Sequence, residues 1–329
     1  MGKLTRPSET RLRQILQRQD PPGFGPHYIP SIKATREEAP SKSRPAWVWW
    51  ETVERNLSTL SPAERAVLVI CLYNPMVWEV HDQRMLPTYP RPHPLSGHPK
   101  AVGLNLPPMR GTVEVATRMG LFSFHPLIRL PTGDNPQEKE TLAFPWIGDL
   151  LLFLEDGSGP YNRNLDIKNE ASEFEQSDIN GVQKGKRGIK LRQKTIARHA
   201  IEKQLYMDAG ISTLMLSRTD YDVNVVANLT QVYLWNRRKN IFTKDQLDEI
   251  TRIFNGSIIT RERPIETAWA ISARHGWRLY DIKIAFYQAI WHRKIRVDLF
   301  EPIEFDYPLR AERRDVLDIY SHWFKRYPV

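Results

Sequence analysis

The feature that most constrains the fold of this chain is a pair of short segments of strand length separated by a turn. The first, Asp149–Leu154, is almost entirely apolar, and the second is Asn164–Lys168. Between them, residues 155–160 read Glu-Asp-Gly-Ser-Gly-Pro, which is a cluster of turn-forming residues. The sequence therefore predicts a β-hairpin over about residues 149–168.

Two carboxylates and one ammonium group are expected at one end of this hairpin. Asp166 and Lys168 are two residues apart and point to the same face of a strand. Asp149 lies across from them, where cross-strand Cβ atoms are about 4.5–5.5 Å apart. A divalent cation would relieve the repulsion between the carboxylates, and oxygen ligands favour Mg²⁺ or Mn²⁺. A lysine beside the cation can orient or help to deprotonate water and neutralise a phosphate, which is the chemistry of phosphodiester hydrolysis. The alternative is an ordinary Asp–Lys pair on a strand edge.

The surrounding pattern predicts two domains. Residues 46–230 alternate helices and strands around the hairpin, which favours an α/β domain, with an irregular Pro-rich insertion over about 86–143. One helix is expected to open at Ser61–Glu64, which has capping-box spacing, and an amphipathic one to span 197–209. Residues 231–329 are mostly helical with an alternating stretch at 294–300, which is the order of a winged-helix-like domain.

The charge of the chain favours a polyanionic partner. Lys and Arg exceed Asp and Glu by 47 to 38, so nucleic acid is the first candidate and acidic lipid the second. We predict that residues 1–45 form a flexible basic arm with a short helix around Glu9–Gln19. The run 184–198 has no acidic residue, and its alternative interpretation is a solvated helix face. We predict that it binds DNA phosphates through Lys184, Lys186, Arg187, Lys190, Arg192 and Lys194.

Two classes of protein are disfavoured by the sequence. The single cysteine, Cys71, excludes a disulfide framework or a thiolate zinc site within the chain. No apolar stretch reaches the roughly 18 residues that span a bilayer, and the polar N-terminus lacks a signal-peptide pattern. We therefore expect a soluble, cytoplasmic protein with no membrane partner.

Several blocks of the sequence resemble a known nuclease family. Asp149 followed by Asp166-Ile-Lys168 resembles the bipartite motif of PD-(D/E)xK nucleases, with Gly148 where proline is usual. The chain also resembles TnsA, the endonuclease subunit of heteromeric transposases, over about residues 55–305 with gaps. The blocks that carry this likeness are Ser61–Arg65, Asn74–Val77, His81–Gln83, the Lys-rich segment and helix over 190–210, and Asn228-Leu229.

The resemblance implies a restriction-endonuclease-like nuclease domain followed by a winged-helix-like domain. It implies a catalytic set of Glu64, Asp149, Asp166 and Lys168, in which the three carboxylates bind Mg²⁺ or Mn²⁺. Glu114, on a short helix expected over 112–119, is an alternative to Glu64 as the ligand borne on a helix. Glu64 can also be interpreted as a helix-start glutamate stabilised by the helix dipole.

By this resemblance the chain would cleave the 5′ strand at transposon ends during cut-and-paste transposition. Its partners would be double-stranded DNA, a DDE-type (TnsB-like) transposase subunit and an AAA+ (TnsC-like) ATPase regulator, in the nucleoid of a bacterial cytoplasm. Two alternatives stay open. Cutting of plain DNA without partners would indicate a stand-alone restriction- or repair-type endonuclease, whereas failure to bind Mn²⁺ would indicate a non-catalytic DNA-binding scaffold on a nuclease fold.

Overall fold

The computed structural model describes residues 7–132, 135–175 and 186–326, with the backbone alone for 132, 135–138 and 186–190. The chain divides into two compact units, each described here by itself. The first comprises Met1–Arg65, Met76–Asp220 and Phe324–Val329, and the second comprises Ala66–Pro75 and Tyr221–Trp323. The first unit is mixed α/β and the second is mostly helical, which confirms the predicted fold class at this level.

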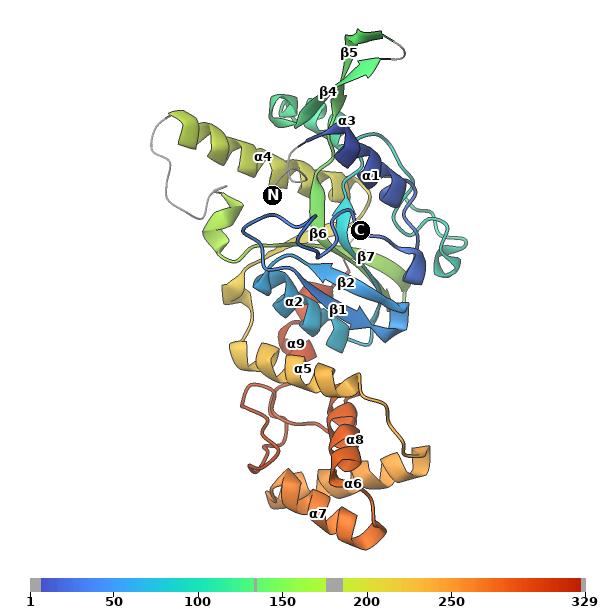
Figure 1. Ribbon diagram of the computed structural model, residues 1–329, viewed down its shortest axis with the longest axis vertical. Coiled ribbons are helices and arrows are strands. Elements are labelled where there is room, and N and C mark those ends of the chain that lie inside the picture. Colours follow the sequence, from blue (N-terminus) through green and yellow to red (C-terminus); the bar gives the residue numbers. More distant parts are fainter. Residues whose placement is uncertain (1–6, 133–134, 176–185, 327–329) are drawn as a thin grey trace. The chain divides into compact units, whose positions relative to one another are not determined.

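A mixed four-stranded sheet lies at the centre of the first unit (Figure 1). Its order is β3 (Val77–Met85), β6 (Ile147–Asp156), β7 (Gly159–Ile167) and β8 (Ser212–Leu216). Strand β6 is antiparallel to both β3 and β7, and β8 runs parallel to β7. Strands β6 and β7 form the predicted hairpin, and the two-residue turn between them is closed by a hydrogen bond of 2.8 Å from the Ser158 N–H to the Asp156 carboxylate.

Helix α4 (Lys186–Asp208) makes the crossover that the parallel pair β7–β8 requires. It begins eleven residues before the expected start at 197, because the preceding basic stretch consists largely of Lys, Arg, Gln and Leu, which are good helix formers. Its apolar residues Ile201 and Leu205 are fully buried in a cluster with Leu151 and Phe153 of β6. Helix α3 (Thr112–Arg118) contributes to the same cluster. This packing fixes α4 over the part of the sheet that carries Asp166.

Residues 7–45 are folded in the structure, contrary to our expectation that 1–45 would form a flexible basic arm. Helix α1 (Glu9–Gln19) forms as predicted, and Ser8 caps it by accepting a hydrogen bond from the Arg11 N–H. Its apolar face is buried, with Ile15 at 1 % exposure, and Tyr28 donates a hydrogen bond of 2.8 Å to the Asp82 carbonyl of β3. The few apolar residues of this segment therefore suffice to hold it on the sheet.

The remaining parts of the first unit are hairpins and short helical turns. Strands β1 (Ala46–Trp50) and β2 (Arg55–Thr59) pair with each other, and so do β4 (Leu127–Thr132) and β5 (Asn135–Ala143) within the expected insertion. The 3₁₀ turns are Gly25–His27, Glu51–Val53, Pro99–Ala101, Phe122–Phe124, Ala171–Phe174 and Arg218–Asp220. The insertion is thus only partly irregular.

The second unit consists of helices around α8. The helices are α5 (Val223–Asn236), α6 (Lys244–Thr260), α7 (Pro264–His275), α8 (Leu279–Trp291), α9 (Val316–Ile319) and α10 (Ser321–Phe324), while α2 (Pro62–Tyr73) crosses the boundary between the units. Phe286 of α8 packs against Phe254 of α6 with ring centroids 4.7 Å apart. The alternating stretch 294–300 forms an isolated bridge at Val297 instead of the expected strand. Across the described residues, every helix is too short or too polar to cross a bilayer.

Candidate functional site

The end of the β6–β7 hairpin brings together three of the residues that the sequence singled out. Leu150 pairs with Leu165, which places Asp149 and Asp166 at adjoining positions of the two strands. The Lys168 ammonium donates to Asp166 Oδ1 at 2.8 Å and lies 3.4 Å from Asp149 Oδ2. The Ile167 N–H donates to the same Asp149 oxygen at 2.7 Å. Two carboxylates therefore share one ammonium, as the hairpin geometry predicted.

Glu64 lies close to this cluster and also serves the start of α2. Its N–H donates to Ser61 Oγ at 3.1 Å, and its carboxylate accepts hydrogen bonds from the Leu60 N–H at 2.8 Å and from Gln83 Nε2 at 2.9 Å. Burial raises the pKa of Glu64 to about 8, and the negative charge of Asp149 adds to the shift. Glu64 is thus both a helix-start residue and an electrostatic neighbour of Asp149.

The alternative residue Glu114 has a different environment. It is exposed on α3, and its carboxylate pairs with Arg110 four residues earlier at 3.0 Å. Burial and then the charge of Asp149 raise the pKa of Glu64, while the charge of Lys168 lowers it, so Glu64 lies near both residues. The structure therefore brings Glu64, and not Glu114, to the end of the hairpin.

Gln83 is a site residue that the sequence pattern did not reveal. It belongs to β3, between the pairs Asp82–Leu150 and Arg84–Gly148, and its side chain is buried. Its φ is 49°, a left-handed conformation that costs a residue with a side chain about 1–3 kcal/mol. This backbone conformation accompanies the hydrogen bond to Glu64, so Gln83 helps to position that carboxylate. The sequence contains no signal for it beyond its place in the family-like block His81–Gln83.

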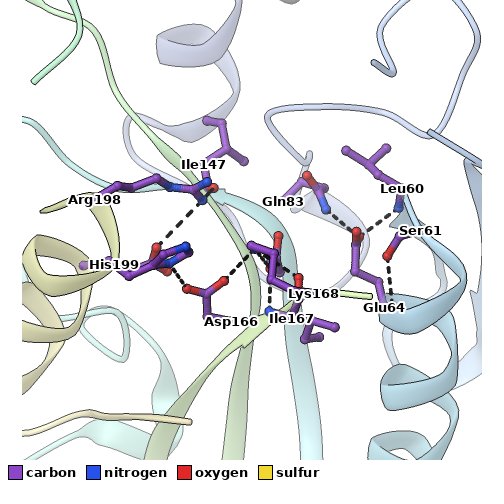
Figure 2. Close-up of polar contacts among 12 residues, drawn as sticks. Leu60, Ser61, Glu64, Gln83, Ile147, Asp166, Ile167, Lys168, Arg198 and His199 are labelled. Atoms are coloured by element: carbon purple, nitrogen blue, oxygen red, sulfur yellow. Dashed lines mark hydrogen bonds and ion pairs between the residues drawn. The ribbon is translucent and has the colours of Figure 1, made fainter. Parts of the chain in front are cut away.

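Helix α4 adds a second set of polar side chains on the other side of Asp166 (Figure 2). His199 Nδ1 is hydrogen-bonded to Asp166 Oδ2, while Asp166 Oδ1 accepts from Lys168. Glu202 Oε1 accepts a hydrogen bond of 3.2 Å from the amide of Asn164. Arg198 donates to the Ile147 carbonyl at 2.8 Å, and Figure 2 shows it beside His199. The sequence analysis missed these residues, although the three-residue spacing of His199 and Glu202 places them on one face of a helix.

The electrostatics of the cluster fix the charge of its central residues. Burial would raise the pKa of Asp166, but the hydrogen bond from His199 and the charge of Lys168 lower it well below its ordinary value. Burial would lower the pKa of Lys168, but Asp149 and Asp166 raise it. Lys168 is therefore a permanent ammonium group, which suits it to neutralising a phosphate and not to accepting a proton. The pKa of Asp149 is raised by burial.

The side chains differ in their access to solvent. Those of Asp149 and Lys168 are 15 % and 17 % exposed, whereas those of Asp166, His199 and Glu202 are only 3 %, 6 % and 1 % exposed. A phosphate could therefore approach Asp149 and Lys168, while the α4 side is closed.

Ligand geometry sets one group of side chains apart. Asp166, His199 and Glu202 form a group whose ligand atoms all lie within 4.8 Å of one another. It is the one group of three or more such acidic, histidine or cysteine residues in the described parts of the chain. This group shares only Asp166 with the predicted set of Glu64, Asp149 and Asp166. Glu64, Asp149 and Asp166 do not form such a group in the structure, although Lys168 lies between Asp149 and Asp166 and the charge of Asp149 acts on Glu64.

The predicted DNA-binding run is described only in part. Lys184 lies outside the described residues, and Lys186, Arg187 and Lys190 belong to α4 by their backbone alone. Arg192 is exposed and ion-paired with Glu175, and Lys194 is exposed. The described end of this run thus presents cationic side chains to solvent.

No protein-family model and no curated protein matches the chain.

Proposed function

We propose that this chain is a metal-dependent DNA endonuclease that hydrolyses phosphodiester bonds. The observation that carries the proposal is the sharing of the Lys168 ammonium by Asp149 and Asp166, at 3.4 and 2.8 Å, at the partly exposed end of a β-hairpin. Glu64 supplies a third carboxylate whose pKa responds to Asp149. Strongly shifted acidic groups around one lysine are typical of functional sites.

The donor atoms suit a hard divalent cation. Glu64, Asp149 and Asp166 offer oxygen atoms alone, which Mg²⁺ and Mn²⁺ prefer. Burial is the largest cause of the raised pKa of both Glu64 and Asp149. The negative charge of Asp149 further raises the pKa of Glu64, and that of Asp166 further raises the pKa of Asp149. A cation held by these carboxylates would relieve that repulsion. When bound, it would lower the pKa of a water molecule and stabilise negative charge on the phosphate.

The residues of the chain have separate roles in this proposal. Lys168 stays protonated and offsets the charge that develops on the phosphate. The Ile167 N–H holds one oxygen of Asp149, and Gln83 and the Leu60 N–H hold one oxygen of Glu64. These hydrogen bonds position the carboxylates before substrate binds, so that little reorganisation is needed during the reaction.

The finer proposal is that of a TnsA-like transposase subunit. The excess of Lys and Arg supports binding to double-stranded DNA, with the exposed residues of α4 as phosphate contacts. The helical second unit would be winged-helix-like and would contact DNA or a partner. A TnsB-like transposase and a TnsC-like ATPase would complete the assembly, and the chain would cut the 5′ strand at transposon ends.

Cleavage of DNA carrying the ends of the element tests this proposal. The full chain is assayed with Mg²⁺ or Mn²⁺, alone and together with a TnsB-like transposase and a TnsC-like ATPase. We expect 5′-strand cleavage that Asp149→Ala and Lys168→Ala each reduce by at least about 10²-fold while DNA affinity is retained.

Glu114→Gln is the matched control, because it removes an exposed glutamate from a helix of the same unit without touching the cluster. It should cleave like the parent. Cleavage that persists in both Asp149→Ala and Lys168→Ala would contradict the site, and cleavage by the chain alone would favour a stand-alone nuclease.

A further inference from the structure

The buried side of Asp166 has the composition of a separate cation site. Asp166 projects from β7, and His199 and Glu202 project from one face of α4, with ligand atoms within 4.8 Å of one another. Histidine and carboxylate three residues apart on a helix recur in the metal sites of helical proteins. Figure 2 shows the His199 ring turned toward Asp166, on the side away from Lys168.

Two polar atoms of this group have no hydrogen-bond partner among the residues that the structure describes. They are His199 Nε2 and Glu202 Oε2, and both are buried. The other atoms are engaged: His199 Nδ1 bonds to Asp166, and Glu202 Oε1 accepts from Asn164. The Arg198 guanidinium lies 3.9 Å from Glu202 Oε2, which is too far for a hydrogen bond. Because unpartnered buried polar atoms are costly and uncommon, these two indicate that a ligand belongs here.

The backbone of β6 is shaped to accept Glu202. A Cβ atom at Gly148 would lie 3.0 Å from Glu202 Oε1, which is tighter than nine in ten contacts of real Cβ atoms. Glycine at this position thus lets α4 bring the Glu202 carboxylate directly against the strand, beside Asp166. The close approach of Glu202 accounts for the glycine at position 148, where the PD-(D/E)xK pattern usually has proline.

We propose that Asp166, His199 and Glu202 bind a first-row divalent transition metal such as Mn²⁺ or Zn²⁺, and that this ion ties α4 to β7. One imidazole nitrogen and two carboxylates favour these ions over Mg²⁺, which prefers oxygen ligands. The three side chains are nearly inaccessible, so the site is closed and structural. Binding of the ion to both residues would replace the hydrogen bond between His199 Nδ1 and Asp166 Oδ2, and Asp166 Oδ1 would keep its bond to Lys168.

The proposal does not depend on DNA hydrolysis, although Asp166 belongs to both sites. Pulsed electron paramagnetic resonance of Mn²⁺ bound to the full chain separates them, because it detects a directly coordinated nitrogen. Glu64 and Asp149 provide oxygen alone, so a nitrogen coupling reports His199. We expect this coupling in the parent and in Asp149→Asn, including when the latter does not cleave DNA, and its loss in His199→Ala.

Two further variants complete the test. His275→Ala is the control, because His275 also pairs with a glutamate, Glu249 at 3.4 Å, but belongs to the second unit. It should keep the coupling. Glu202→Gln preserves the shape of the side chain and should lower the Mn²⁺ affinity of this site by at least about tenfold. This variant still tests the site if His199→Ala does not fold. No nitrogen coupling in the parent, a coupling that survives His199→Ala, or unchanged affinity in Glu202→Gln would overturn the proposal.

Discussion

Replacing Glu64 by glutamine should remove a pH-dependent penalty on folding. Burial, and then the charge of Asp149, raises the pKa of Glu64 from 4.5 to about 8. Between these two values the folded state keeps a proton that the unfolded state releases. The free energy of unfolding therefore falls as pH rises through this window, by up to about 1.4 kcal/mol per pH unit. Glutamine cannot ionise and should abolish this part of the dependence.

The structure sets both the size of the effect and the conditions. The difference between the free energies of unfolding of Glu64→Gln and the parent should change in favour of the variant by up to about 4 kcal/mol as pH rises from about 5 to about 8. The assay is urea unfolding followed by tryptophan fluorescence, with a chelator present so that no cation stabilises the carboxylate. Glu114→Gln, at an exposed position, should follow the parent. A difference between Glu64→Gln and the parent that does not change with pH would refute a protonated, buried Glu64.

Three further substitutions test the packing around the site by urea unfolding. Arg55→Met should cost about 3–5 kcal/mol, because it leaves the fully buried Asp82 carboxylate without the guanidinium that now lies 2.6 Å away, and a loss under about 1 kcal/mol would contradict this. Gly148→Ala should cost about 1–3 kcal/mol through contact with Glu202, and a Glu202→Ala background should reduce that cost. Ile15→Ala should cost about 2–5 kcal/mol because the side chain is fully buried, whereas a flexible arm would show no change.

The hairpin was predictable because its signals are local. A strand-length apolar run, a turn cluster and a second strand fix which residues face each other, and so place Asp149, Asp166 and Lys168 together. The mostly helical character predicted for residues 231–329 is likewise confirmed by the helices over 244–260, 264–275 and 279–291. The alternating pattern at 294–300, by contrast, was not sufficient to form a strand.

Strand β3 was not predictable from its own residues. It contains Glu79 and Asp82, which read as polar and exposed, yet both are buried. Their charges are compensated by Arg55 of β2, which lies 2.6 Å from Asp82 and 3.2 Å from Glu79. Because the burial of Glu79 and Asp82 depends on Arg55, more than twenty residues earlier, the residues of β3 alone show no strand pattern.

The α4 side of the site was missed for the same reason. His199 lies 33 residues from Asp166 along the chain, and it and Glu202 reach Asp166 only because the apolar face of α4 packs on β6. The basic run before them drew attention to DNA binding, and the acidic and histidine residues that follow on the same helix were read only as part of an amphipathic pattern.

The central claim is that the carboxylates at the end of the β6–β7 hairpin hold a divalent cation beside Lys168. Anomalous diffraction from crystals soaked in Mn²⁺ locates such an ion directly. We predict a peak within about 2.0–2.6 Å of carboxylate oxygens of Asp149 and Glu64 or Asp166, and its absence from crystals of Asp149→Asn. Crystals of the parent with no peak at Asp149 under saturating Mn²⁺ would contradict the account.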